Sequence, residues 1–188
     1  MISQLGASVG RGGAAHRLLS AGRKSVSGAQ MTLLVGQHVY KIDKKGRVSV
    51  PKPFRDSFEG QDFAGLYAYP LFKVAAIEAC GEDFMIRLSE SLEDLDLFSD
   101  EHDDLAAVIL ENAHRLPFDP EGRVVLPKEL LDFAEITDMV LFVGRGARLQ
   151  MWEPSAYEIN RKQAFERARS RGATLRLRRR PGDGETSS

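Results

Sequence analysis

Basic side chains cluster in one short stretch of this 188-residue chain, although its overall formal charge is only −1. Between positions 41 and 55, six basic residues face a single acid, Asp43, so the stretch carries a net charge of +5. A two-stranded β-ribbon is narrow enough to enter the DNA major groove, where arginine pairs with guanine and lysine neutralises phosphates. The cluster therefore predicts a nucleic-acid interface, formed by Lys41, Lys44, Lys45, Arg47, Lys52 and Arg55.

The rest of the chain has a different charge. Residues 1–30 carry four basic residues and no acid, and residues 161–188 carry nine basic residues against three acids. Residues 31–160 hold thirteen basic and twenty-four acidic residues, a net charge of −11. An acidic centre with basic ends is not typical of a uniformly basic DNA-coating protein. Any DNA contact made by the centre must therefore be local.

The basic stretch has a second copy further along the chain. Residues 43–58 (DKKGRVSVPKPFRDSF) and 119–134 (DPEGRVVLPKELLDFA) are identical at seven of sixteen positions, at a spacing of 76. Each copy begins with Asp-x-x-Gly, which is typical of a tight turn with glycine where φ is positive. We expect structural turns at Asp43 with Gly46 and at Asp119 with Gly122. In the second copy, Arg123 and Lys128 repeat Arg47 and Lys52, and join the expected DNA-contacting residues.

The elements that position these turns are predicted to be hairpins. Local turn chemistry favours pairing of 39–42 with 47–50, and of Phe118 with 123–126. A short helix opening at Pro51 or Pro127 follows each hairpin. A second strand pair then follows: 74–79 with 84–88 around a turn at Cys80, and 139–143 with 148–152. Each half is too small for a core of its own, so the two halves should share one.

Between and after the repeats the pattern is helical. Residues 89–113 predict an acidic connector of two helices, and another helix should begin near Pro154 and end before Gly172. That last helix is expected to pack one side against the rest of the protein, through Tyr157, the stem of Arg161, Ala164, Phe165 and Ala168. The run Glu101-His102-Asp103-Asp104 is compatible with a metal site, but acids complementing a helix N-terminus are the favoured interpretation.

Nothing in the chain predicts an enzyme. Ser49 has no neighbouring histidine, and the four histidines lack ligand spacing, so no catalytic residue, metal or cofactor is expected. The single cysteine, Cys80, excludes an internal disulfide, and a reducing cytoplasm is the default setting. Phe142 and Trp152 are expected in the core. No apolar run reaches the length of a membrane span, so no membrane partner is expected.

The two turn motifs, VYKIDKKGRVSVPKPFR and RLPFDPEGRVVLPKEL, resemble those of the MraZ family over about residues 32–165. These are bacterial transcriptional regulators linked to the division and cell-wall gene cluster, built from two tandem SpoVT-AbrB-type domains. The resemblance implies an α+β fold, mainly β, in which two β-β-α-β-β units interleave as a pseudo-dimeric swapped-hairpin barrel. It further implies ring-like homo-oligomers and binding to double-stranded DNA at direct repeats upstream of the protein's own operon.

The resulting domain organisation has six parts. These are a disordered basic extension (1–31), which departs from the family pattern, a first repeat (32–88), the acidic connector (89–113), a second repeat (114–155), a helix (156–171) and a flexible Arg-rich tail (172–188).

The function expected is that of a sequence-specific, nucleoid-associated repressor of transcription. Two alternatives remain: an antitoxin-like DNA binder of the same superfold with a protein partner, and an enzyme on a related barrel. Arg47 and Arg123 also have a second interpretation, because each could bridge to the aspartate four residues earlier and only stabilise its turn. DNA contact is favoured for Arg47. For Arg123 the two interpretations are balanced, because Glu121 stands where the first copy has Lys45.

Overall fold

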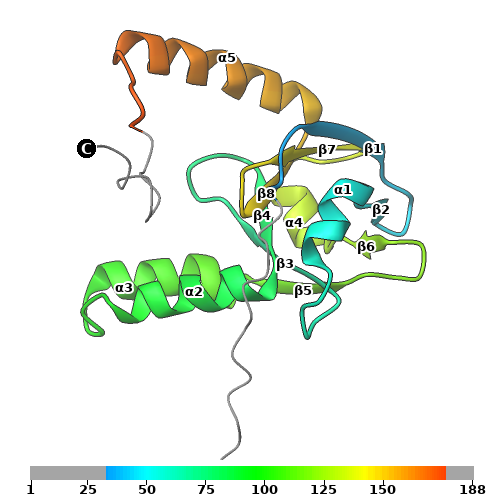
Figure 1. Ribbon diagram of the computed structural model, residues 1–188, viewed down its shortest axis with the longest axis horizontal. Helices are drawn as coiled ribbons and strands as arrows, with labels where there is room; N and C mark the ends of the chain where they lie inside the picture. The colour runs from blue at the N-terminus through cyan, green and yellow to red at the C-terminus, as the bar shows by residue number, and fades with distance from the viewer. Residues whose placement is uncertain (1–32, 177–188) are drawn as a thin grey trace, which may run out of the picture. The chain divides into compact units, whose positions relative to one another are not determined.

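A computed structural model describes residues 33–176 and consists of two β-β-α-β-β units followed by a helix (Figure 1). The first unit contains β1 (Gln37–Lys41), β2 (Arg47–Ser49), α1 (Lys52–Arg55) with a 3-10 turn η1 (Asp56–Phe58), β3 (Gly65–Pro70) and β4 (Ile77–Cys80). The second contains β5 (His114–Pro117), β6 (Arg123–Val125), α4 (Lys128–Phe133), β7 (Met139–Gly144) and β8 (Arg148–Trp152). The predicted α+β class is confirmed.

Three helices lie outside the units. Between the units lie α2 (Glu82–Glu93), which begins seven residues before the predicted connector, and α3 (Asp100–Ala106), which continues as a π-helical turn η2 (Ala107–Glu111). The helix α5 (Pro154–Ser170) follows the second unit. None of the helices in residues 33–176 is both long and apolar enough to cross a membrane. The predicted extension at 1–31 and the end of the predicted tail, from residue 177, lie outside the described residues.

The predicted local hairpins are wrong, because the strands that flank each turn pair across the two units. β1 pairs antiparallel with β7, and β2 pairs antiparallel with β6. The turns themselves form, since the Asp43 amide donates to Arg47 O at 3.0 Å and the Asp119 amide to Arg123 O at 2.9 Å. In a local hairpin each strand would turn only about two apolar side chains toward the core, and these would bury little apolar surface. Exchange of strands lets both units contribute to one larger core, which favours the swapped pairing.

The strands form two sheets, and one approximate twofold axis relates the strands of the first unit to those of the second. Six strands lie in the order β1-β7-β8-β4-β3-β5, while β2 and β6 form a separate two-stranded ribbon. At the centre of the ribbon Val48 lies opposite Val124, which is its equivalent at the repeat spacing of 76. The flanking hydrogen bonds repeat the symmetry: Val50 N donates to Gly122 O at 3.1 Å, and Leu126 N to Gly46 O at 2.9 Å.

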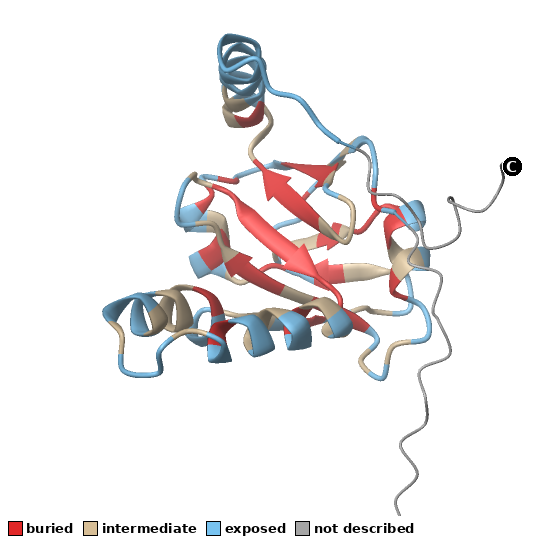
Figure 2. Cartoon of the chain, turned by 60° about the vertical axis from the view of Figure 1, so that its left-hand side comes forward, coloured by how far each residue is buried: buried red, intermediate tan, exposed pale blue. Residues whose placement is uncertain are grey.

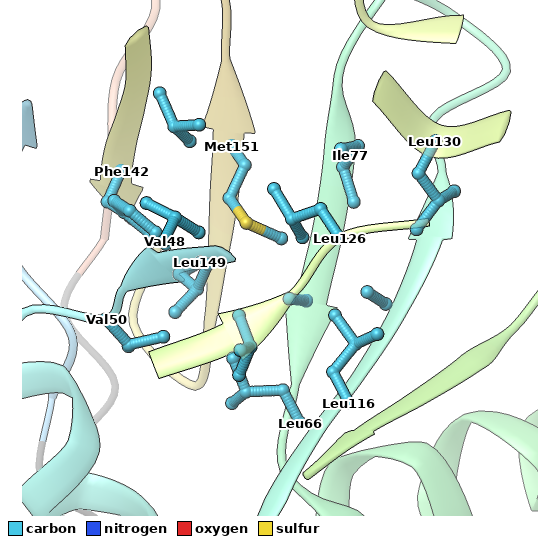
Figure 3. Close-up of a cluster of buried hydrophobic side chains, with 14 of the residues drawn as sticks. Val48, Val50, Leu66, Ile77, Leu116, Leu126, Leu130, Phe142, Leu149 and Met151 are labelled. Carbon is cyan, nitrogen blue, oxygen red and sulfur yellow. The ribbon is translucent and has the colours of Figure 1, made fainter. Parts of the chain in front are cut away.

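The main core lies between the ribbon and one face of the large sheet. Figure 3 shows Val48 and Leu126 of the ribbon region pointing toward Leu149 and Met151 of β8. All four side chains are at most 2% exposed, and Phe142 of β7 is fully buried beside them. Alternate residues of each strand point into this core, as the twofold pleat of a β-strand requires. The core placement predicted for Phe142 is confirmed, and Trp152 is buried on the opposite face.

The opposite face of the large sheet packs against α2, α3 and the first turn of α5, and here two further predictions are wrong. Residues 84–88 form part of α2 and not a strand, so β3 and β4 make the second strand pair of the first unit. Phe84 and Leu88, four residues apart, pack on one side of α2 against the cluster around Tyr69 and Cys80. Cys80 itself ends β4 and is fully buried, rather than lying in a turn.

The expected packing of α5 is also wrong. Only Tyr157, in its first turn, is buried, whereas Phe165 is 69% exposed and every residue from 161 to 170 is exposed (Figure 2). Tyr157 contacts Trp152 edge-to-face with ring centroids 5.6 Å apart. The helix does carry apolar residues at helical spacing, as predicted, but within residues 33–176 nothing packs against them beyond the first turn.

Candidate nucleic-acid interface

The outer face of the ribbon carries four side chains in a twofold arrangement. Val48 and Val124 point into the core, so their strand neighbours point outward. Arg47 lies opposite Val125, and Ser49 lies opposite Arg123. The arginines predicted from the two repeats are therefore brought together on one surface, although 76 residues separate them in the chain.

Each turn is held by its aspartate in the same way. Asp43 Oδ1 accepts hydrogen bonds from the backbone amides of Lys45 at 2.8 Å and Arg47 at 2.9 Å, and Oδ2 accepts from Arg47 Nε at 2.7 Å. Hydrogen bonding by the Arg47 amide and guanidinium holds the pKa of Asp43 below its ordinary value. In this first turn (Asp43–Gly46) the aspartate thus orders both the backbone and the arginine side chain.

The second turn (Asp119–Gly122) repeats this geometry. Asp119 Oδ1 accepts from the Arg123 amide at 2.8 Å and Oδ2 from Arg123 Nε at 2.7 Å. Burial acts to raise the pKa of Asp119, but the hydrogen bonds from Arg123 prevail and the pKa is lowered. Gly46 and Gly122 have φ of +77° and +73°, the left-handed region that turn chemistry predicted for them. A Cβ at Gly46 would also approach Leu126 O to 2.8 Å.

The two interpretations of the arginines are compatible. Arg47 uses Nε for Asp43, and in the part of the chain that the structure describes its Nη groups have no recorded hydrogen-bond partner. An arginine held through Nε is pre-oriented, and the free Nη edge can still donate to a base or a phosphate. Arg123 differs, because its Nη2 donates to Glu121 at 2.7 Å. The ion pair to aspartate is therefore common to both turns, while the free guanidinium edge belongs to the first.

The other residues predicted to contact DNA differ in how exposed they are and in whether they have partners within the protein. Lys41, Lys44 and Lys45 are exposed around the first turn. Arg55, by contrast, is partly buried and its Nη1 donates to Val50 O at 2.9 Å and to Gly122 O at 3.3 Å, so it joins α1 to the second turn.

Two lysines lie on the short helices. Lys52 pairs with Asp56, and Lys128 pairs with Asp132, each through an ion pair spanning one helical turn. Sequence reasoning did not include Val125 in this surface, although it is 54% exposed between the arginines. The alternation of Arg123, Val124 and Val125 along β6 was the signal that could have found it.

Other candidate sites have structural roles. His102 and Asp103 lie in the first turn of α3, where the Ser99 hydroxyl accepts from the His102 amide at 3.1 Å, as expected of an N-cap. Within residues 33–176 no group of three or more histidines, cysteines or acids is placed to hold a metal. Burial raises the pKa of Cys80 to about 12, with a smaller contribution from Glu78, so its thiol is a poor nucleophile.

Two interleaved β-β-α-β-β units with paired Asp–Arg turns define a single-chain SpoVT-AbrB-type barrel. A family profile described as "MraZ protein, putative antitoxin-like" matches residues 109–179. The "Transcriptional regulator MraZ" of Gluconacetobacter diazotrophicus is 39% identical over 81% of this chain and 98% of its own length. The proteins of the same name from Pelagibacter ubique and Parvibaculum lavamentivorans are 42% and 44% identical, over 72% and 70% of this chain and 88% and 83% of theirs. This chain belongs to the MraZ family.

Proposed function

We propose that this protein is a transcriptional regulator that binds double-stranded DNA through the outer face of the ribbon. The observation that carries the proposal is the first turn, where Arg47 is oriented by Asp43 and surrounded by exposed lysines. The relatives described above are named as transcriptional regulators, which supports the same conclusion.

The contacts follow from the chemistry of the side chains. The Nη edge of Arg47 is suited to guanine O6 and N7 in the major groove, and the Ser49 hydroxyl can donate to or accept from a neighbouring base. Lys41, Lys44 and Lys45 would neutralise phosphates and set the register of the ribbon on the duplex. Arg55, Lys52 and Lys128 would contribute less, because each already has an intramolecular partner.

A single ribbon should bind weakly. The remainder of the central region is acidic, and a few phosphate contacts give affinities near the non-specific range of roughly 10⁻⁴–10⁻⁶ M. We therefore propose that the protein self-associates, as a ring-like homo-oligomer, and presents several ribbons to direct repeats about one helical turn apart. Bound upstream of its own operon, such an assembly would act as a repressor at the nucleoid.

The test uses purified full-length protein and a duplex carrying the DNA upstream of its own coding sequence. Arg47→Ala should weaken specific binding by roughly 1–3 kcal/mol while the melting temperature changes little. Arg145→Ala removes an exposed arginine from the β7–β8 turn, away from the ribbon, and should leave binding unchanged. Equal binding by wild type and Arg47→Ala would contradict the proposed interface.

Multivalency is tested on probes with two footprinted repeats. Moving the second repeat by about 5 base pairs, half a helical turn, should remove the gain in affinity that two repeats give over one. Equal affinity for one repeat and two, from a protein that light scattering shows to be monomeric, would contradict the multivalent mechanism.

A further inference from the structure

The backbone of the ribbon is nearly twofold symmetric, but the side chains on its two sides differ in charge and polarity. Its register relates Arg47 to Arg123 and places Val48 against Val124 on the approximate twofold axis. The aspartate–arginine hydrogen bonds of the two turns agree within 0.1 Å. If the side chains followed the same symmetry, the two turns on either side of the axis would present the same groups to DNA.

The charges do not follow the backbone. At the positions equivalent to Lys41, Lys44 and Lys45 the second unit has Pro117, Pro120 and Glu121. From 41 to 47 the first turn region carries four basic residues and one acid, a net charge of +3. From 117 to 123 the second turn region carries one basic residue and two acids, a net charge of −1. A phosphate backbone is therefore attracted to one turn and repelled by the other.

Glu121 contacts Arg123 directly, and this contact explains why the second turn is less able to bind DNA. Its Oε2 accepts a hydrogen bond from Arg123 Nη2 at 2.7 Å, and its side chain remains 63% exposed. Arg123 is thus held by Asp119 at Nε and by Glu121 at Nη2. Binding of a base or phosphate by that guanidinium would require Glu121 to move away, and the freed carboxylate would then lie beside the DNA backbone.

We propose that Glu121 is a specificity-determining residue that makes the barrel bind DNA in one orientation, with the first turn in the groove. The proposal rests on the function proposed above. Two equivalent turns would favour a palindromic site, because twofold symmetry in the protein is matched by twofold symmetry in the duplex. One dominant turn instead selects a non-palindromic element with a defined direction. Copies bound side by side then require elements that point the same way.

The outward residues next to the arginines add to this direction. Ser49 on β2 offers a hydroxyl, whereas its equivalent on β6, Val125, offers an exposed apolar surface suited to the methyl group of thymine. The two sides of the axis therefore differ both in charge and in the base edges they can contact.

The main experiment is the charge reversal Glu121→Lys, which restores the residue type of the first turn. Two probes are used: the single element footprinted by wild type, and the same element joined to its inverted copy. We expect Glu121→Lys to prefer the inverted pair several-fold over the single element, and wild type to show no such preference. For Glu121→Lys, a plot of the logarithm of the DNA-binding constant against the logarithm of salt concentration should be steeper than for wild type by roughly 1–2, because one or two phosphate contacts are added. Glu90→Lys on α2, also exposed, makes the same charge change away from the ribbon and serves as the matched control.

Orientation is measured directly with a DNA-cleaving iron chelate attached at Asp138→Cys. Asp138 lies beside the first turn, since its carbonyl accepts from the Ile42 amide at 2.8 Å. The native Cys80 is fully buried and should not be labelled. Wild type should cleave on one side of each element, and Glu121→Lys on both sides.

Four outcomes separate this proposal from the function on which it rests. Cleavage on both sides by wild type would overturn the proposal, and so would equal effects of Glu121→Lys and Glu90→Lys on probe preference. If Arg47→Ala binds as wild type, the proposed interface itself fails. The reciprocal change Lys45→Glu should abolish binding to the single element while leaving the melting temperature unchanged, and retention of that binding would contradict the dominance of the first turn.

Discussion

The two faces of the large sheet differ in how well they preserve the internal repeat. On the ribbon face, equivalent residues occupy equivalent places, and β1–β7 pairing repeats as β5–β3 pairing: His38 lies opposite Phe142 as His114 lies opposite Ala68. On the helix-covered face the repeat is lost. The acidic α2 and α3 pack beside Tyr69 and Cys80, whereas α5 packs beside Trp152 through a single turn.

A buried polar group illustrates this loss of symmetry. On the helix-covered face Glu78 accepts from Gln150 at 3.0 Å and forms an ion pair with Arg148, while Gln150 accepts from the Trp152 indole at 3.0 Å. Glu78 and Gln150 are equivalent positions of the two units, 72 residues apart and paired across β4 and β8, but the positions equivalent to Arg148 and Trp152 hold Ala76 and Cys80. A shared core must satisfy both units at once and so retains the symmetry. The outer face has different partners on each side and is free to diverge.

Charges placed in the shared core should lower the stability of the protein the most. Val48→Asp and Val124→Asp should each destabilise the protein by about 4 kcal/mol or more, because each places an unpaired charge at the twofold axis. The two values should be similar, since the environments are equivalent. Chemical denaturation measures both. Val125→Asp, on the same strand but pointing outward, is the control and should be nearly neutral for stability. A mild effect of one core variant alone would show that the two units do not share the core equally.

The second prediction concerns the helix-covered face. Glu78→Ala should destabilise the protein by about 3 kcal/mol, because it leaves Arg148 and Gln150 without their partner in a largely buried site. The exposed Glu90→Ala on α2 should cost no more than about 0.5 kcal/mol. Urea denaturation of the two variants gives the comparison. Equal stabilities would mean that the polar group contributes nothing beyond its packing.

The third prediction compares the two turns by acid titration. The pKa values of Asp43 and Asp119 are lowered, so their hydrogen bonds contribute stability fully above the unfolded-state pKa, near 3.8. That contribution is lost as the pH falls through the lower pKa values of the folded protein. Carboxyl NMR should show both groups ionised below pH 3.8, and Arg47→Ala should raise the pKa of Asp43 while leaving Asp119 unchanged. A shift of both would contradict the independence of the turns.

The smallest expected effect lies in α5. Phe165→Ser should change the free energy of unfolding by no more than about 0.5 kcal/mol, because this side chain is 69% exposed. Urea denaturation at low protein concentration measures this free energy for wild type and variant, because contacts between subunits then contribute least. A large loss of stability there would show that Phe165 is covered by a contact made in solution.

Much of the fold was predictable because its signals are local. The Asp-x-x-Gly spacing predicted turns at Asp43 and Asp119, and valine alternation predicted which side of the strand is buried. The same alternation predicted that Arg47 points outward. One failure was also local in origin: Phe84 and Leu88 fit a strand or a helix, and nothing nearby in the sequence distinguishes α2 from a hairpin strand.

The repeat, its turns and the uneven charge of its two copies could all be predicted from the amino-acid sequence, since each follows from residue types at short spacing. Which strands pair depends instead on contacts between the two units. Two hairpins of equal local quality were possible, but exchange of β1, β2, β5 and β6 between units buries more apolar surface in a common core. The folded structure was also needed to show that Arg123 is held by Glu121 whereas the Nη edge of Arg47 has no hydrogen-bond partner within residues 33–176, because that difference depends on how side chains meet across a folded turn.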